Sequence, residues 1–402
     1  MSRSFLYIAY PMRLDLGAAN AIQTYNTVRE LQKLLPDMCL VIPRWLNEPS
    51  AFTDLGALHL PRPAVNKLSR FLPWGGWSYI ERTIYSFMLV MLLLVWRLSG
   101  RRYRVLYVRD TVCAAWLGLL GPLHGSRIVY EVHDLEAGHP SKASRWPRAF
   151  WTRFLPWLDH VALTRAVKIV SLTQTFKDWV LQNGIKKAED TAVIPDAFDP
   201  DLYYPVDVSE ARMQLGLSAN AFIVGYAGLT FAYRNVDLLV EAFAKIAADD
   251  YNAMLILVGG RPQEVEELQS LATKRHIPQA QIMITGQLPQ ERSAPYVQSA
   301  DVLAIPDTVT GMTASPLKLF EYMAAGKPLI CKDMPALREI VEETAAIFFK
   351  GGDVDSLAEG LRVLRQDPVL RERMGKAALA QSAGYTYASR ARKIAEVARG
   401  IR

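Results

Sequence analysis

Residues 315–328 read SPLKLFEYMAAGKP, and this stretch decides the fold more than any other. It predicts a helix over about 316–325, followed by a Gly-Lys-Pro break and a buried strand. Pro316 suits a helix start, where a missing N–H costs nothing, and Ser315 can cap the helix. The free N–H groups at 314–317 and the helix dipole together predict a diphosphate site, provided that this tip is accessible.

Outward from this stretch, short apolar runs alternate with amphipathic helical patterns, which predicts parallel sheets. The expected strands are 4–10, 38–43, 104–109, 127–132, 168–172, 222–227, 253–258, 281–285, 301–305, 328–331 and 345–348. The expected helices are about 20–35, 78–98, 111–120, 148–164, 174–183, 235–247, 262–275, 316–325, 335–342 and 353–365. Because 402 residues exceed one ordinary core, we expect two domains, 1–195 and 196–384. A last helix at 385–402 either packs back on the first domain, to which we assign it, or caps the second.

Charge and tryptophan are unevenly distributed along the chain. The net charge is +6, but residues 1–195 have 24 Lys and Arg against 14 Asp and Glu, whereas residues 196–402 have 22 against 26. All nine tryptophans lie in the first half. A basic, Trp-rich half suits an anionic surface, which can be lipid headgroups, nucleic acid or a phosphorylated acceptor. Three dispersed cysteines indicate neither a disulfide framework nor a zinc site, and fit a reducing compartment.

Two segments of the first half are candidates for membrane contact. Residues 84–96 are almost wholly apolar and bracketed by Arg82 and Arg97, but about 20 Å of helix is too short to cross a bilayer. Residues 146–157 interleave Arg with Trp, as interfacial segments do. The alternative is a core helix at 84–96 and an ordinary amphipathic helix at 146–157. With 14 basic against 5 acidic residues over 62–153, we favour peripheral contact with an anionic membrane.

The stretch at 315–328 resembles the C-terminal donor-site signature of the retaining GT-B glycosyltransferases, the glycosyltransferase group one, family four class. The resemblance extends over nearly the whole chain and implies an α/β GT-B fold, in which two Rossmann-like doubly wound parallel-sheet domains face a central cleft. The family pattern is Glu, seven residues, Glu. Its second Glu maps onto Glu321, a carboxylate that can hold the ribose diol. Its first Glu, which contacts the donor sugar in the family, maps onto the non-acidic Thr313.

The same resemblance covers two loops of the second domain. In the loop that begins at Gly228, the family has two cationic side chains that bind the donor diphosphate. The corresponding residues here are Leu229 and Arg234, so this chain keeps one of the two cations. Gln287 and Leu288 occupy the loop whose main chain meets the nucleobase. The predicted donor-binding residues are Gly17, Gly228, Gln287, Leu288, Thr313, Ser315, Pro316, Leu317 and Lys318.

In the first domain, His133 and Asp134 directly follow a strand, and ligands of doubly wound sheets bind beyond the strand C-termini. His133 resembles the family histidine that contacts the donor sugar near its 6-position, and Asp134 is either an acceptor-side residue or an N-cap. Arg109, at another strand end, either meets an acidic acceptor or pairs with Asp110. Gly17 is the one glycine retained from the family's Gly-Gly loop after the first strand.

These observations predict a hexosyltransferase that uses a nucleoside-diphosphate sugar and retains configuration, with His133, Glu321 and Arg234 as catalytic residues. No cofactor is expected, a UDP-sugar is the favoured donor, and the sequence has no metal-binding motif. The expected acceptor is a lipid or a lipid-linked glycan at the cytoplasmic face of the cell membrane. Nucleic-acid binding would leave the Glu321 motif unexplained. A nucleotide-sugar epimerase of this fold, or a non-catalytic nucleotide-sugar-binding relative, stays open because Leu229 and Thr313 replace charged residues.

Overall fold

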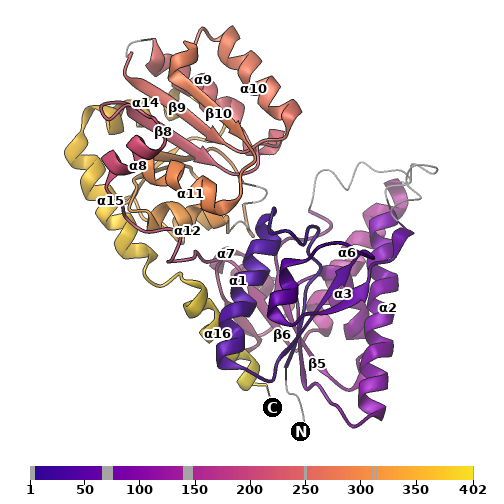
Figure 1. Cartoon of the computed structure of the whole chain (residues 1–402). Coiled ribbons are helices and arrows are strands. Elements are labelled where there is room, and N and C mark those ends of the chain that lie inside the picture. The colour runs from indigo at the N-terminus through magenta and orange to yellow at the C-terminus, as the bar shows by residue number, and fades with distance from the viewer. Residues whose placement is uncertain are drawn as a thin grey trace. The chain divides into compact units, whose positions relative to one another are not determined.

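The computed structural model describes residues 5–65, 76–138, 148–248, 251–308, 311–313 and 315–401, without the side chains of 148 and 149. The chain divides into two compact units. Unit 1 comprises Met1–Pro195 and Tyr387–Arg402, and unit 2 comprises Asp196–Thr386. Each unit is an α/β domain built on one parallel sheet, as Figure 1 shows.

The sheet of unit 1 has seven strands in the order β3-β2-β1-β4-β5-β6-β7, all paired in parallel. They are β1 (Phe5–Ile8), β2 (Cys39–Arg44), β3 (Leu58–Pro61), β4 (Val105–Val108), β5 (Arg127–Val132), β6 (Lys168–Ser171) and β7 (Thr191–Val193). β1 is central and buried, with Tyr7 in register with Leu40 on one side and Tyr107 on the other. The short edge strands β3 and β7 are absent from the expected set, because so few residues carry little periodicity.

The helices of unit 1 pack against its sheet. They are α1 (Ala19–Leu34), η1 (Ala51–Leu55), α2 (Trp77–Leu98), α3 (Thr111–Leu119), α4 (Gly121–His124), α6 (Arg148–Arg165), α7 (Gln174–Gln182), η3 (Ala188–Asp190) and α16 (Tyr387–Arg399). α16 lies beside α1, and its Ala391 and Ile394 join the apolar core that α1 forms with β1 and β2 (Figure 1). The C-terminal helix therefore belongs to unit 1, although the 191 residues of unit 2, Asp196–Thr386, separate it from the rest of that unit in the sequence.

The sheet of unit 2 has six parallel strands in the order β10-β9-β8-β11-β12-β13. They are β8 (Phe222–Ala227), β9 (Ala253–Val258), β10 (Ile282–Gly286), β11 (Val302–Ile305), β12 (Leu329–Lys332) and β13 (Ala346–Phe349). The helices are α8 (Val208–Gln214), η4 (Ala232–Arg234), α9 (Val236–Ala247), α10 (Pro262–Lys274), η5 (Gln279–Gln281), α11 (Gln290–Ser299), α12 (Leu317–Ala324), α13 (Pro335–Arg338), α14 (Val354–Gln366) and α15 (Pro368–Ser382). Two buried apolar clusters form its interior.

Sequence patterns predict the strands of unit 2 to within a residue or two, and its helices less well. α8, α11 and α15 are not in the prediction. α11 contains Pro295, an interior proline that weakens a helical pattern, and the apolar residues of α15 do not gather on one face. A helix predicted over 335–342 is one short turn, α13.

Candidate functional site

Glycines stand at the C-terminal ends of three neighbouring strands of unit 2, and two of them join the loops after β9 and β10. Gly228 follows β8, Gly259 follows β9, and Gly286 ends β10. The N–H of Gly259 donates to the carbonyl of Gly286 at 2.8 Å. Gly259 has φ 133°, and a Cβ there would lie 1.9 Å from the carbonyl oxygen of Gly228. Only glycine fits this position, so the C-terminal edge of the sheet presents bare backbone.

Lys318 reaches this backbone from the first turn of α12. A Cβ on Gly228 would lie 2.9 Å from the Lys318 Nζ, so the absent side chain makes the room for the ammonium. The Nζ lies 3.8 Å from the centre of the Tyr226 ring, and the residue is 9% exposed. It has no hydrogen-bond partner among the described residues. Burial and the nearby charge of Arg234 hold the pKa of Lys318 well below its ordinary value, although Glu321 opposes them.

Arg234 supplies a second cation beside Lys318. It ends the turn η4, and its buried Nε also lacks a hydrogen-bond partner in the part of unit 2 that the structure describes. Asn235 adopts φ 50° and donates from Nδ2 to Asp307 Oδ2 at 2.7 Å, and Lys332 donates to the same carboxylate at 2.8 Å. This cluster fixes the turn that carries Arg234. The sequence prediction missed Asn235, Asp307 and Lys332, although a carboxylate just after a buried strand is a usable signal.

Glu321 lies on α12 one turn beyond Lys318 and is 8% exposed. Its Oε1 accepts a hydrogen bond from Gln290 Nε2 at 2.8 Å, and the Tyr203 hydroxyl also bonds to this carboxylate. Burial raises the pKa of Glu321 to about 7, against the opposing effects of Lys318 and of these two hydrogen bonds. The sequence prediction missed Gln290 and Tyr203, which are distant in the chain and carry no motif.

Several details of the predicted helix tip are wrong. Pro316 is the N-cap and makes no side-chain capping bond, while Ser315 Oγ instead accepts a hydrogen bond from the Asp196 N–H at 3.0 Å. Residue 314, one of the predicted N–H donors, lies outside the described residues. The tip is also less open than predicted: the exposed fractions are 5% for Thr313, 7% for Ser315 and 8% for Leu317. The case for an anion site therefore rests on the unpaired cations.

The predicted nucleobase loop connects β10 to α11. Gly286 has φ 70°, Gln287 is exposed, and Leu288 is half-buried against the core of unit 2. The side chain of Leu288 is thus used in packing. No group of three or more His, Cys, Asp or Glu residues arranged to hold a metal ion occurs among the described residues.

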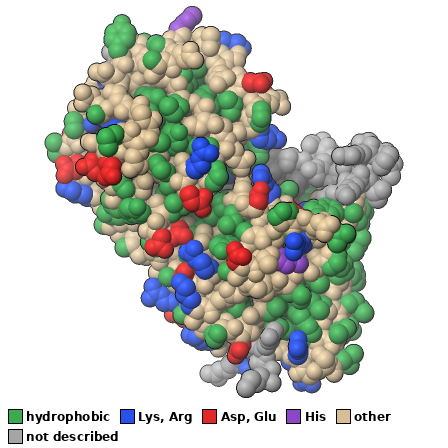
Figure 2. Space-filling model, viewed as in Figure 1, with side chains coloured by type: hydrophobic (Ala, Val, Ile, Leu, Met, Phe, Trp, Pro, Cys, Tyr) green, Lys and Arg blue, Asp and Glu red, His purple; other side chains and the backbone are tan. Residues whose placement is uncertain are grey.

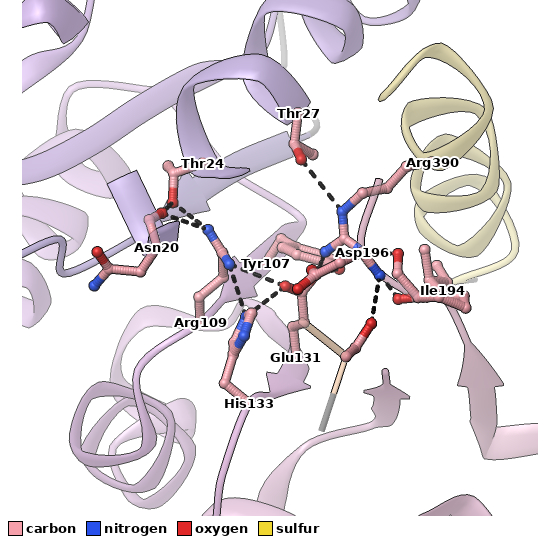
Figure 3. Close-up of polar contacts among 12 residues, drawn as sticks. Asn20, Thr24, Thr27, Tyr107, Arg109, Glu131, His133, Ile194, Asp196 and Arg390 are labelled. Atoms are coloured by element: carbon pink, nitrogen blue, oxygen red, sulfur yellow. Dashed lines mark hydrogen bonds and ion pairs between the residues drawn. The ribbon is translucent and has the colours of Figure 1, made fainter. Parts of the chain in front are cut away.

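In unit 1, His133 is part of a polar network at the C-terminal ends of β4 and β5, which Figure 3 shows. Its Nε2 lies 2.6 Å from Glu131 Oε1 and 2.8 Å from Arg109 Nη2. The side chain of His133 is 30% exposed, whereas those of Arg109 and Glu131 are 5% and 0% exposed. Burial and the Arg109 charge lower the pKa of His133 to about 4, against the opposing effect of Glu131. The imidazole is therefore neutral near pH 7.

The predicted pairing of Arg109 with Asp110 is wrong. Arg109 Nε donates to Glu131 Oε1 at 2.9 Å, and the guanidinium also donates to Thr24. Asp110 instead caps α3 by accepting from the Cys113 N–H and pairs with Arg82 at 3.0 Å. Since Arg109 is committed to interior partners, its predicted acceptor-side contact has no support in its geometry.

The two remaining predicted residues of unit 1 lie in loops. Asp134 accepts a hydrogen bond from the Leu135 N–H, and residues 136–138 form a turn and not the start of a helix, so its predicted N-cap role is wrong. The Gly17 N–H donates to Asp15 Oδ1 at 3.0 Å, just before α1. The left-handed conformation of this loop falls on Leu16, with φ 57°, and not on Gly17. A Cβ on Gly17 would lie 2.9 Å from the guanidinium carbon of Arg13, an exposed side chain that can move aside, so the position does not require glycine.

The two predicted membrane segments lie on α2 and α6, although residues 146 and 147 are outside the described part of the chain. α2 is 22 residues long, and it is the one described helix that is long and apolar enough to cross a membrane, a test that core helices of soluble proteins also pass. One face of α2 packs inward, and the opposite face is exposed. The exposed apolar residues, which we call the α2 stripe, are Ile84, Phe87, Met91, Val95 and Leu98.

The α2 stripe continues onto the neighbouring helices. The Phe87 ring lies 5.4 Å from Trp116 on α3, and Trp116 lies 6.2 Å from Trp157 on α6. Phe150 and Trp157 are 47% and 41% exposed. Figure 2 shows hydrophobic side chains gathered along the edge of unit 1 that α2 forms. The helix at 84–96 is therefore buried on one face and exposed to solvent on the other, so it is not a fully buried core helix.

Comparison with known proteins connects these sites to one family. The family model described as "Glycosyltransferase Family 4" matches residues 21–202, and the model "Glycosyl transferases group 1" matches residues 207–381. Among similar sequences, a D-inositol 3-phosphate glycosyltransferase of Nocardia farcinica is 29% identical over 211 residues, which are 51% of this chain and 46% of that protein. A GDP-mannose-dependent monoacylated alpha-(1-6)-phosphatidylinositol monomannoside mannosyltransferase of Corynebacterium glutamicum is 27% identical over 177 residues, 43% of this chain and 45% of that protein. The chain thus spans about half the length of the curated relatives it matches.

Solved structures share the fold over nearly the whole chain. HepE from Anabaena, crystallised with UDP, superposes with a TM-score of 0.74 at 18% identity and covers 98% of this chain and 99% of its own. Sucrose-phosphate synthase from Thermosynechococcus elongatus gives a TM-score of 0.75 at 18% identity, with 98% of both chains covered. The two family models, the two parallel-sheet units and these structures agree, and the chain belongs to the group 1, family 4 glycosyltransferases of the GT-B fold.

Proposed function

We propose that this protein transfers a hexose-type sugar from a nucleoside-diphosphate sugar to a membrane-associated acceptor, with retention of configuration. The observation that carries the donor assignment is a pair of buried cationic side chains in unit 2, whose Lys318 Nζ and Arg234 Nε have no hydrogen-bond partner among the described residues. A buried ammonium without a partner costs stability, and a diphosphate would supply the missing counter-charge. Among the relatives, one is named as GDP-mannose-dependent and HepE was crystallised with UDP, which supports a nucleotide-sugar donor.

The residues around these cations suit the rest of the donor. Glu321 can accept hydrogen bonds from a ribose diol, with Gln290 and Tyr203 holding its carboxylate in place. Lys318 and Arg234 stabilise the charge that develops on the leaving diphosphate, an electrostatic role that needs no nucleophilic side chain. His133, as a neutral imidazole, orients the sugar by a hydrogen bond to a hydroxyl. We propose UDP as the nucleotide and a reaction independent of a metal ion.

A thermal-shift screen of UDP, GDP, ADP and CMP and their sugars tests the donor assignment, since a bound ligand stabilises the folded state. We expect one diphosphate to raise the melting temperature of the wild type and of Lys245→Met, which removes an exposed lysine of unit 2. Lys318→Met should show a smaller shift at the same nucleotide concentration. A wild-type protein that binds none of these nucleotides would refute the donor site.

Product analysis separates the transferase from its alternatives. With donor and acceptor together, NMR of the product should show the anomeric configuration of the donor. A new nucleotide sugar formed without acceptor would indicate an epimerase instead. Donor binding with neither hydrolysis nor transfer to any membrane extract would indicate a non-catalytic relative.

The α2 stripe supports a membrane-associated acceptor and a peripheral location on the cytoplasmic face of the membrane. Its apolar side chains are flanked by Arg97 and by exposed arginines at 101, 102 and 104, which suit anionic headgroups. Co-flotation with anionic vesicles tests this location. We expect Met91→Glu with Val95→Glu to abolish flotation, whereas Met213→Glu, at an equally exposed methionine of unit 2, should not. Wild-type protein that remains with the soluble fraction would remove the membrane proposal.

A further inference from the structure

The C-terminal helix α16 brings one arginine into the interior of unit 1. Arg390 is 3% exposed, and all three of its guanidinium nitrogens donate to protein acceptors (Figure 3). Nε donates to Thr27 Oγ1 at 3.2 Å, and Nη2 donates to Glu131 Oε2 at 2.6 Å. Nη1 donates to the carbonyl oxygens of Ile194 and Pro195 at 2.8 and 2.5 Å. Arg390 thus joins α16 to α1, to β5 and to the chain that leaves unit 1.

Glu131 links Arg390 to His133. The carboxylate is fully buried on β5, and its Oε2 accepts from both Arg390 and the Tyr107 hydroxyl. Its Oε1 lies 2.9 Å from Arg109 Nε and 2.6 Å from His133 Nε2. Burial alone would raise the pKa of Glu131, but the two guanidinium groups outweigh it and hold the pKa well below its ordinary value. A single charged carboxylate is therefore held between two arginines and the imidazole.

This arrangement turns one nitrogen of His133 inward and leaves the other for a ligand. Nε2 faces Glu131 and Arg109, while Nδ1 has no hydrogen-bond partner among the described residues. If the proton is on Nε2, that atom donates to Glu131 and Nδ1 is an acceptor. If the proton is on Nδ1, Arg109 donates to Nε2 and Nδ1 is a donor. In both tautomers Nδ1 is the atom that can meet a sugar hydroxyl.

We propose that Arg390, Glu131 and Arg109 are positioning residues for His133, so that the C-terminal helix fixes the orientation of the histidine proposed to hold the donor sugar. This inference rests on the proposed function for the role of His133, but the geometry of the network does not depend on it. Loss of any member of this buried network would leave an uncompensated charge, and hydrogen-bond partners of this kind fix the orientation of a histidine ring. A sugar contact displaced by about 1 Å can cost about 100-fold in rate.

The groups that face His133 predict how its titration responds to each substitution. Arg109, on the neighbouring strand end, and Arg390, on α16, both lower the pKa of His133, whereas Glu131 raises it. Tyr7 and Tyr107 also line the network, but burial raises the pKa of both phenols, so they stay neutral. Removing Arg390 should therefore raise the pKa of His133 above its value of about 4, and neutralising Glu131 should lower it further.

NMR titration of the histidine ring tests this without any substrate. The His133 signal is assigned by its loss in His133→Asn. We expect a raised midpoint in Arg390→Met and a lowered one in Glu131→Gln, each in the full-length protein. The matched control is Arg212→Lys in unit 2, because Arg212 is also buried and donates to two carbonyl oxygens and one carboxylate. It should lose comparable stability and leave the His133 titration unchanged.

Kinetics of the same variants give a second readout. Arg390→Lys keeps the charge, but one ammonium cannot hold four acceptors in a fork, so kcat should fall about 10- to 100-fold. The nucleotide Kd should not change, since the nucleotide contacts proposed above lie in unit 2. If Arg390→Met does not fold, Arg390→Lys and Glu131→Gln carry the test.

Two results overturn the inference: wild-type His133 midpoints in both Glu131→Gln and the folded Arg390 variant, or wild-type kcat in Arg390→Lys. If instead the wild type transfers no sugar while the midpoints shift as expected, the network stands and the proposed function fails.

Discussion

Replacing Lys318 by Met separates the stability of unit 2 from its proposed binding of a diphosphate. The wild-type ammonium is buried, lies over the Tyr226 ring and has no hydrogen-bond partner among the described residues. A buried donor without a partner costs about 1–3 kcal/mol, and the cation–π contact returns about 0.5–2 kcal/mol. Met has nearly the same length, keeps contact with the ring and needs no partner. We therefore expect the substitution to stabilise the protein without nucleotide by about 1–2 kcal/mol.

The same substitution should weaken nucleotide binding. A charge-assisted hydrogen bond contributes about 1.5–3 kcal/mol, so the nucleoside diphosphate should bind about 10- to 150-fold more weakly. In a domain the size of unit 2, 1–2 kcal/mol corresponds to a rise in Tm of about 2–8 °C. Lys318→Met should therefore melt at a higher temperature than the wild type without nucleotide, and gain less from adding it.

The pH dependence gives an independent check on Lys318. Its pKa is lowered in the folded state, so below the ordinary value of 10.5 the unfolded chain binds a proton that the folded chain lacks. Wild-type stability should therefore rise with pH between the lowered pKa and 10.5, and Lys318→Met should remove this slope. A variant that is less stable than the wild type and binds the nucleotide equally well would refute the reasoning.

Three further outcomes follow from the structure. Because Glu321 has a pKa of about 7, its contact with the ribose should weaken as the pH falls below 7. The donor Kd, measured from pH 5.5 to 8.5, should therefore rise at the acid end. In Glu321→Gln the Kd should not depend on pH over this range. The same raised pKa means that ionisation of Glu321 lowers the stability of the folded protein above pH 7, and that this loss disappears as the pH falls toward 4.5. Urea unfolding of the wild type and of Glu321→Gln at several pH values checks this. Gly228→Ala forces a Cβ into a backbone with φ 141°, 2.9 Å from Lys318 Nζ. It should lower the stability of the protein by about 1–3 kcal/mol and also lower its nucleotide affinity. The control is Gly216→Ala, which is also at positive φ but has open space around it and should lower stability alone. Equal nucleotide affinity in the two alanine variants would contradict the placement of Gly228 at the site.

Much of the fold could be read from the chain because it depends on neighbours in the sequence. The buried strands of unit 2 are continuous apolar runs, and the motif at 315–328 combines a proline start, a glycine end and a carboxylate at fixed spacing. These features predicted α12, the two parallel sheets and the placing of Lys318 and Glu321 on one helix. Short edge strands such as β3, and α11 with its internal proline, escaped because their local pattern is weak.

Local sequence patterns place charged residues near the strand ends, but only the folded chain selects which of these residues pair. Arg390 and Glu131 are 259 residues apart, and no periodicity relates them; the return of the chain as α16 beside α1 brings them to 2.6 Å. Likewise Arg109 meets Glu131 on the adjacent strand and not its neighbour Asp110. Within the described part of the chain, Lys318 Nζ has no hydrogen-bond partner, because the glycine-lined edge of the sheet offers it no acceptor side chain. Pairing of buried charges is set by packing across elements, which local spacing does not encode.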